Sequence, residues 1–208
     1  MQIAVIAAQG RSGQAFVKEA LAAGHTVRAG VRGDSPFKED KNLTIVQCDA
    51  TDVSQVTQLI DHCDAVVSLI GHVKGSSDFV QAEATEAIVT AMEVAGVKRF
   101  VSLTGVGVWV QGDRFKGPIN ILNAISAKLG VKRFDDGVKH VEVLHASTLD
   151  WTVMRVLLLS DGEPGAFKLT PHGFAKVPTP RREVARAILE VLEQASFIRQ
   201  YPVISFKR

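Results

Sequence analysis

The chain has 208 residues, of which 46% are hydrophobic and 22% are charged, an ordinary composition for a soluble globular protein. Its net charge of +2 argues against nucleic acid or an anionic membrane as the main partner. No apolar run reaches the roughly 18 residues of a transmembrane helix, and no leader pattern precedes the first apolar stretch. We therefore expect a cytoplasmic protein with one domain over residues 1–208, in which residues 157–208 complete the substrate side.

The first 32 residues have the pattern of a strand over 2–7, a glycine-containing turn, a helix over 14–23 and a second strand over 25–31 that ends on Arg32. Such a turn leaves backbone N–H groups unpaired at the helix N-terminus, where the helix dipole also favours an anion. Gly10 lets the chain approach a pyrophosphate closely, and Gly13 lets the helix pack tightly on the strand. The common dinucleotide motif has a glycine where this chain has Ala7, so an ordinary strand-to-helix turn remains the alternative interpretation.

Arg32 ends the second predicted strand, about 20 residues after the turn, where an NAD-binding chain usually has an acidic residue. A cation at this place suits a 2′-phosphate better than a ribose hydroxyl. The sequence therefore predicts NADP(H) as the cofactor, and the alternative is a solvated charge at the end of a strand.

Strands alternate with helices through most of the remaining chain. Ser76 and Ser77 are the expected N-caps of a long helix, and residues 167–176 suggest hairpin-like pieces. Further strands are predicted over residues 43–47, 65–70, 99–104, 151–157 and 201–204, and helices over 53–61, 78–95, 119–128, 134–146 and 180–193. This alternation favours an α/β fold with a Rossmann-like, doubly wound parallel sheet that binds ligands at the carboxyl ends of its strands.

Cys48 and Cys63 are the two cysteines of the chain. Neither belongs to a CxxC pair or has histidines at metal-binding spacing. We expect small buried residues at both positions and no metal site.

Seven segments in a fixed order carry a resemblance that covers essentially the whole chain. They are IAVIAAQGRSG, HTVRAGVRGDS, QCDATD, DAVVSLIG, GVKRFVSLTG, STLDWTVMR and REVARAILEVLEQASFIRQYPVIS. The chain resembles the atypical short-chain dehydrogenase/reductase group. Within it, the chain is most similar to the NmrA-like NAD(P)H-binding proteins and to the flavin reductase/biliverdin-IXβ reductase branch.

The resemblance implies a cofactor site at the carboxyl ends of several strands. Arg32, with Arg11 and Ser35, would hold the 2′-phosphate through charge-assisted hydrogen bonds, and Asp49 would lie along the adenine. Asp49 has an alternative role as the cap of the next helix, and Gly71 and Thr104 also have purely local uses. The implied site comprises Ala8, Gln9, Gly10, Arg11, Ser12, Gly13, Arg32, Ser35, Asp49, Ala50, Ile70, Gly71, Leu103, Thr104 and Leu157.

The usual catalytic pair of short-chain dehydrogenases, Tyr-x-x-x-Lys, is missing. The resemblance implies that Phe134 takes the tyrosine position and Val138 the lysine position, and Tyr201, the one tyrosine, lies near the C-terminus. This excludes the standard alcohol dehydrogenase mechanism. The catalytic group is therefore unknown, and the weak candidates are His140, Lys139 and His72.

The flavin reductase branch also lacks that tyrosine, so hydride transfer stays possible for this chain. The first functional hypothesis is an NADPH-dependent reductase of a flat small-molecule acceptor, such as a flavin or a quinone. Against a biliverdin-type activity, Gly105 stands where that branch has a serine, and Gly137 and Leu158 stand where it has histidines. The alternative is an NADP(H)-sensing regulator with a protein partner. A nucleotide-sugar epimerase or dehydratase is less favoured because it usually needs the missing pair.

Overall fold

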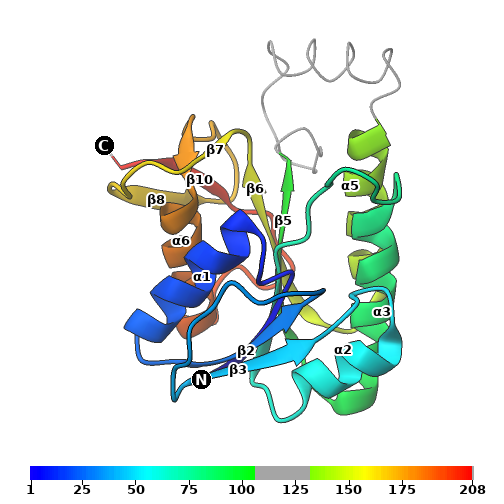
Figure 1. Cartoon of the computed structure of the whole chain (residues 1–208). Helices are drawn as coiled ribbons and strands as arrows, with labels where there is room; N and C mark the ends of the chain where they lie inside the picture. The colour runs from blue at the N-terminus through cyan, green and yellow to red at the C-terminus, as the bar shows by residue number, and fades with distance from the viewer. Residues whose placement is uncertain (106–131, 208) are drawn as a thin grey trace.

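The computed structural model describes residues 1–105 and 132–207 (Figure 1). The helix predicted over residues 119–128 lies outside this part of the chain. Within the two described stretches, no helix has the length and apolar character that crossing a bilayer requires.

The described strands form one mostly parallel sheet with the order β3-β2-β1-β4-β5-β6-β10-β8. All pairs are parallel except β10 with β8, which is antiparallel. The strands are β1 Gln2–Ile6, β2 Thr26–Val31, β3 Leu43–Gln47, β4 Ala65–Ser68, β5 Arg99–Gly105, β6 Asp150–Val156, β8 Phe167–Thr170 and β10 Val203–Phe206. A separate short parallel pair joins β7 Leu159–Ser160 to β9 Thr179–Pro180. The order 3-2-1-4-5-6 is that of a Rossmann-like doubly wound sheet, which confirms the predicted fold class.

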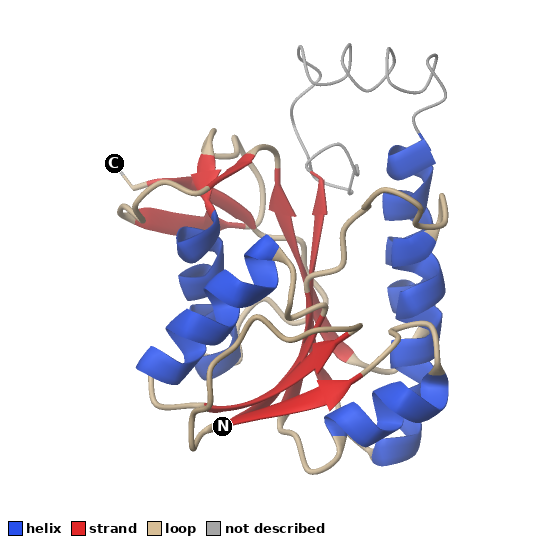
Figure 2. Cartoon of the chain, in the orientation of Figure 1, coloured by secondary structure: helices blue, strands red, loops and turns tan. Residues whose placement is uncertain are grey.

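Helices cover both faces of the sheet (Figures 1 and 2). α1 Arg11–Ala22 and α6 Arg181–Glu193 pack on one face, whereas α2 Val53–Ile60, α3 Val80–Ala95 and α5 Lys132–Ala146 pack on the other. Every residue of β4 is buried because this strand lies in the middle of the sheet and has helices on both sides. Such double burial explains why the central strands are almost continuously apolar in sequence.

Two local predictions are wrong, and both fail because a distant residue replaces a nearby one. Ser76 and Ser77 do not cap α3: Phe79 occupies its N-cap position without a side-chain bond, and the carboxylate of Asp136 from α5 accepts from its first N–H groups. The region around residues 167–176 forms no local hairpin, because β8 pairs instead with β10, with Phe167 opposite Phe206.

A buried acid joins α1 to α6. Glu19 is 9% exposed, and its carboxylate accepts hydrogen bonds of 2.6 Å from Arg182 Nε and 2.8 Å from Arg186 Nε. Burial by itself raises the pKa of Glu19, but the hydrogen bonds and charges of Arg186 and Arg182 outweigh it, and the net pKa lies below the ordinary 4.5. Glu19 is therefore an anion in the folded protein at neutral pH.

Glu19→Gln should lower the free energy of unfolding at pH 7 by about 1–2 kcal/mol, between the values for exposed and buried ion pairs. Because the folded-state pKa is lowered, this stabilisation is present above the unfolded-state pKa and is lost as the pH falls through the folded-state value. Urea unfolding of both proteins at pH 7 and pH 3 measures the difference. A gap of equal size at both pH values would contradict the assignment.

Candidate functional site

A cavity of about 510 Å³ opens at the carboxyl ends of β1 and β4. These strands are neighbours, and the chain continues from them in opposite directions along the sheet, so the cavity lies at the topological switch point. Its walls come from the turn after β1, the ends of β2 and β3, the segment after β4, the start of α3 and the start of α6.

The turn between β1 and α1 is so tight that backbone atoms leave no room for a side chain at Gly13. A Cβ atom on Gly13 would lie 2.4 Å from the carbonyl oxygen of Ala7 and 2.5 Å from that of Ala8. Gly10 is the N-cap of α1, and no side chain caps that end of the helix. The first N–H groups of α1 therefore have no intrahelical partner at the cavity wall, which is the arrangement that binds phosphate.

The backbone conformation at Ala7 explains why a glycine is common at this position. Its φ angle is 59°, in the left-handed region that disfavours residues with a Cβ atom. The degenerate motif therefore keeps the backbone shape of the glycine turn and accepts local strain at Ala7.

Gln9 ties the turn to the end of β2. Its side-chain amide donates to the carbonyl oxygen of Arg32 at 3.1 Å, and its amide oxygen accepts from the N–H of Arg32. This pair of bonds fixes the backbone of Arg32, whose exposed side chain lines the cavity. No local pattern in the sequence indicates this pair of bonds, because the two residues belong to different elements.

Asp49 and Asp52 have separate roles. Asp52 caps α2 by accepting from the N–H groups of Ser54 and Gln55 at 2.9 and 3.2 Å, so the alternative role considered for Asp49 belongs to Asp52. Asp49 lines the cavity and accepts from the N–H and hydroxyl of Thr51 at 3.0 and 2.8 Å. These two bonds lower the pKa of Asp49, burial opposes them in part, and the charge of Arg32 lowers it further.

The cavity brings together most of the residues that the resemblance implied. Those that line it are Gln9, Gly10, Arg11, Ser12, Arg32, Asp49, Ala50, Ile70 and Gly71. A Cβ atom on Gly71 would have no neighbour within 4 Å, so this glycine keeps its part of the wall open.

Six implied residues lie outside the lining of this cavity. Ala8 and Gly13 are buried beneath the turn. Leu103 and Thr104 are buried at the end of β5, Leu157 is exposed just after β6, and the hydroxyl of Ser35 accepts from the N–H of Phe37. Cofactor contacts for these residues stay predictions.

Sequence reasoning missed several parts of the wall. Gly30 has no room for a side chain, because a Cβ atom there would lie 2.6 Å from Leu59 Cδ2. Cys48 also lines the cavity, and burial raises the pKa of its thiol to about 11. Arg181 reaches the same cavity from the C-terminal part of the chain. The glycine at position 30 was readable in principle as a site of close packing, but nothing near Arg181 in sequence points to a shared site.

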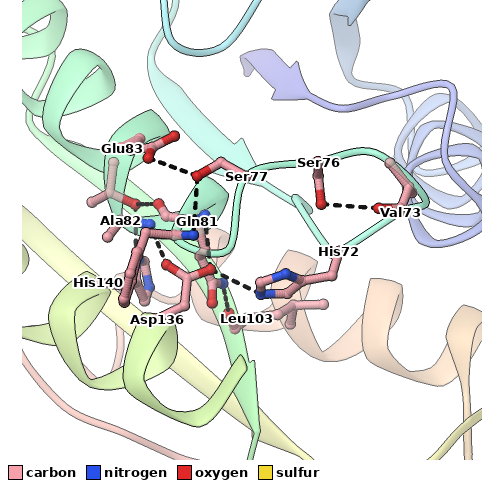
Figure 3. A network of polar contacts seen from close by, with 12 residues as sticks. His72, Val73, Ser76, Ser77, Gln81, Ala82, Glu83, Leu103, Asp136 and His140 are labelled. Atoms are coloured by element: carbon pink, nitrogen blue, oxygen red, sulfur yellow. Dashed lines mark hydrogen bonds and ion pairs between the residues drawn. The ribbon is translucent and has the colours of Figure 1, made fainter. Parts of the chain in front are cut away.

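His72 lines the cavity and contacts a buried carboxylate (Figure 3). Asp136 is fully buried; its oxygens accept from the N–H groups of Gln81 and Ala82 at 3.0 and 2.8 Å. His72 Nε2 lies 2.9 Å from Asp136 Oδ2. Both oxygens of Asp136 therefore accept from N–H groups at the N-terminus of α3, and this places the carboxylate beside His72.

The expectation that His140 reaches the cleft is not met. It is fully buried, with Nδ1 2.7 Å from the Thr85 hydroxyl and Nε2 2.9 Å from that of Ser102. The Thr85 proton goes to the carbonyl oxygen of Gln81 at 2.6 Å, so Nδ1 of His140 carries a hydrogen and Nε2 accepts from Ser102. Burial lowers the pKa of His140 to about 4, which leaves a neutral ring at pH 7.

Lys139 does not line the cavity either. Its ammonium nitrogen lies 3.8 Å from the centroid of the Phe79 ring, at cation–π distance. Of the three catalytic candidates, His72 is therefore the one at the cavity wall.

Residues 7–195 match the profile of a family described as NAD(P)H-binding. The chain belongs to this NAD(P)H-binding family. The match confirms the resemblance inferred from the seven segments, and the glycine turn with its uncapped helix end fits the phosphates of such a cofactor.

Solved structures share the fold of this NAD(P)H-binding protein. The oxidoreductase YlbE from Lactococcus lactis is 17% identical with a TM-score of 0.79, and the alignment covers 100% of this chain and 92% of that one. A short-chain dehydrogenase/reductase from Veillonella parvula in complex with NADP is 16% identical, with a TM-score of 0.80 and coverage of 99% and 94%. A candidate NADH-flavin reductase from Streptococcus pneumoniae is 21% identical, with a TM-score of 0.79 and full coverage of both chains.

Ala7→Gly should raise the free energy of unfolding by about 0.5–1 kcal/mol, because relief of the left-handed backbone outweighs the extra entropy of glycine. Ala15→Gly, inside α1, is the matched control and should lower it by about 0.5–1 kcal/mol. Urea unfolding measures both variants. A loss of stability in Ala7→Gly equal to that in the control would contradict the left-handed conformation.

Proposed function

We propose that this protein binds NADP(H) in preference to NAD(H) and reduces a flat conjugated acceptor, such as a flavin or a quinone. The observation that carries the cofactor preference is the exposed guanidinium of Arg32 at the cavity wall, with its backbone fixed by Gln9. The reduction is supported more generally by family membership and by structural neighbours that are named as oxidoreductases.

Each part of the wall has a task in this proposal. The N–H groups at the start of α1 bind the pyrophosphate, and Arg32 pairs with the 2′-phosphate. Asp49 accepts from the exocyclic amine of the adenine, while Gly71 leaves room for a ribose. When bound, the reduced nicotinamide supplies a hydride.

An acceptor that receives a hydride also needs a proton to become a neutral product. His72 is the best-placed group to give it, because it is an imidazole at the cavity wall beside an anchored carboxylate. The carboxylate of Asp136 lies 2.9 Å from Nε2 of His72 and orients the ring, and solvent returns the proton after release of the product. Asp136 thus has a positioning role and does not itself touch the acceptor.

Arg32→Ala should abolish the preference for NADPH over NADH. A 2′-phosphate paired with arginine contributes about 1.5–3 kcal/mol, or roughly a 10- to 150-fold difference in Kd. Fluorescence titration with both nucleotides measures this ratio for the two proteins. Lys41→Ala, an exposed cation of the same loop that does not line the cavity, is the control and should keep the preference. An unchanged ratio in Arg32→Ala would remove the assignment of Arg32.

His72→Gln should lower kcat for NADPH oxidation about a hundredfold, the lower end of the usual range for general acid catalysis, with less than about a twofold change in the Kd for NADPH. The assay follows NADPH absorbance with FMN, FAD and a panel of quinones. His62→Gln, an exposed histidine that does not line this cavity, is the control and should keep the wild-type rate. Wild-type protein that binds NADPH but reduces no acceptor above the enzyme-free rate would contradict the reductase proposal and favour the NADP(H)-sensing alternative.

A further inference from the structure

Arg181 places a third arginine at the cavity, from a part of the chain that no dinucleotide motif covers. It is the first residue of α6, and its side chain is 10% exposed. Two other arginines, Arg11 and Arg32, line the same cavity. A guanidinium this close to the glycine turn has the right charge and shape to bind a phosphate.

Asp161 forms ion pairs with two of these arginines, Arg181 and Arg11. Its Oδ1 lies 2.5 Å from Arg181 Nη1, and its Oδ2 lies 3.8 Å from Arg11 Nη1. The side chain of Asp161 is 68% exposed, so the carboxylate can return to water at little cost. Asp161 therefore engages the same donors that a bound phosphate would need.

Arg11 and Arg181 line both the cavity and a neighbouring groove. This groove of about 860 Å³ lies between α1, the loop over residues 36–40 and Asp161. The neighbouring Arg182 lines the groove and not the cavity, and it pairs with Glu19 and Glu163. Two adjacent arginines of α6 thus have different surroundings: Arg182 fastens α6 to α1, whereas Arg181 is available to the cavity.

We propose that Arg181 binds a phosphate group of the dinucleotide and that Asp161 competes with this phosphate for Arg181 and Arg11. The inference rests on the proposed cofactor binding. When the phosphate enters, both guanidinium groups release the carboxylate of Asp161 and bind phosphate oxygens, which carry more negative charge. The side chain of Asp161 then moves into solvent. The segment after β7 thereby becomes part of the cofactor site, although it lies about 150 residues from the glycine turn in sequence.

The first test is the Kd of Arg181→Gln for NADPH and for NADH, measured by fluorescence titration. We expect about tenfold weaker binding, the value for loss of one charged hydrogen-bonding partner. Equal weakening for both nucleotides identifies the pyrophosphate as the bound group, and weakening for NADPH alone identifies the 2′-phosphate. Lys18→Gln, a cation that lines only the groove, is the control for a general loss of positive charge.

The second test uses a variant that should lower the Kd for NADPH instead of raising it. Asp161→Asn should bind NADPH about three- to tenfold more tightly, because the two arginines lose their competing anion. Glu163→Gln removes an equal charge nearby but frees only Arg182, and it should change the Kd less than about twofold. Thermal unfolding midpoints of all four variants establish that each is folded.

The outcomes separate this inference from the proposed function. Absence of NADPH binding by the wild-type protein would overturn both. Wild-type binding with an unchanged Kd in Arg181→Gln, or weaker binding in Asp161→Asn, would overturn the role of Arg181 or the competition by Asp161 and leave the cofactor proposal intact.

Discussion

The close approach of α1 to the end of β1 is the constraint on which the rest of this structure depends. Gly13 contacts two backbone carbonyl groups, and no atom larger than hydrogen fits on its Cα. This approach directs the first N–H groups of α1 at the switch point of the sheet. It also brings α1 against α6, where Glu19 binds Arg182 and Arg186. The same geometry therefore builds the end of the cavity at the glycine turn and attaches the C-terminal part of the chain to it.

On the other face of the sheet, polar side chains hold the helices in place. Asp136 and His140 are four residues apart on α5 and thus share one face of that helix. Asp136 caps α3, and His140 bonds to Thr85 of α3 and Ser102 of β5. Fully buried polar groups are costly unless every partner is present, so this face of α5 specifies how α5, α3 and β5 fit together.

The elements were predictable from sequence wherever the signal was local. Each predicted strand or helix inside the described residues exists, apart from the hairpin at residues 167–176, because apolar runs and periodicity report on burial along one segment. The glycine turn and Arg32 were likewise visible.

What could not be predicted depends on pairs of residues that are distant in the chain. These are the cap of α3 by Asp136, the two hydrogen bonds between the Gln9 side chain and the Arg32 backbone, and the position of Arg181. A serine before a helix looks like a cap whether or not a carboxylate from another helix takes its place, so Ser77 was misleading. His140 was misleading for the same reason, since a histidine on an amphipathic helix has the same sequence pattern whether it faces a cleft or the core.

The contrast between Asp136 and the missing Tyr-Lys pair suggests how this chain differs from dehydrogenases with the standard mechanism. The resemblance implies that Phe134 and Val138 take the two positions of that pair, and they lie four residues apart on α5. The neighbouring positions Asp136 and His140 carry polar groups instead, but these face α3 and β5 and are buried. These two side chains of α5 therefore hold α5, α3 and β5 together. Among the described residues, α5 approaches the cavity wall through the carboxylate of Asp136, which lies 2.9 Å from Nε2 of His72, a residue of the segment after β4. The proposed proton donor, His72, thus belongs to the segment after β4 and is positioned by Asp136 of α5. In the standard mechanism, the helix that corresponds to α5 would itself supply the tyrosine that acts as the acid.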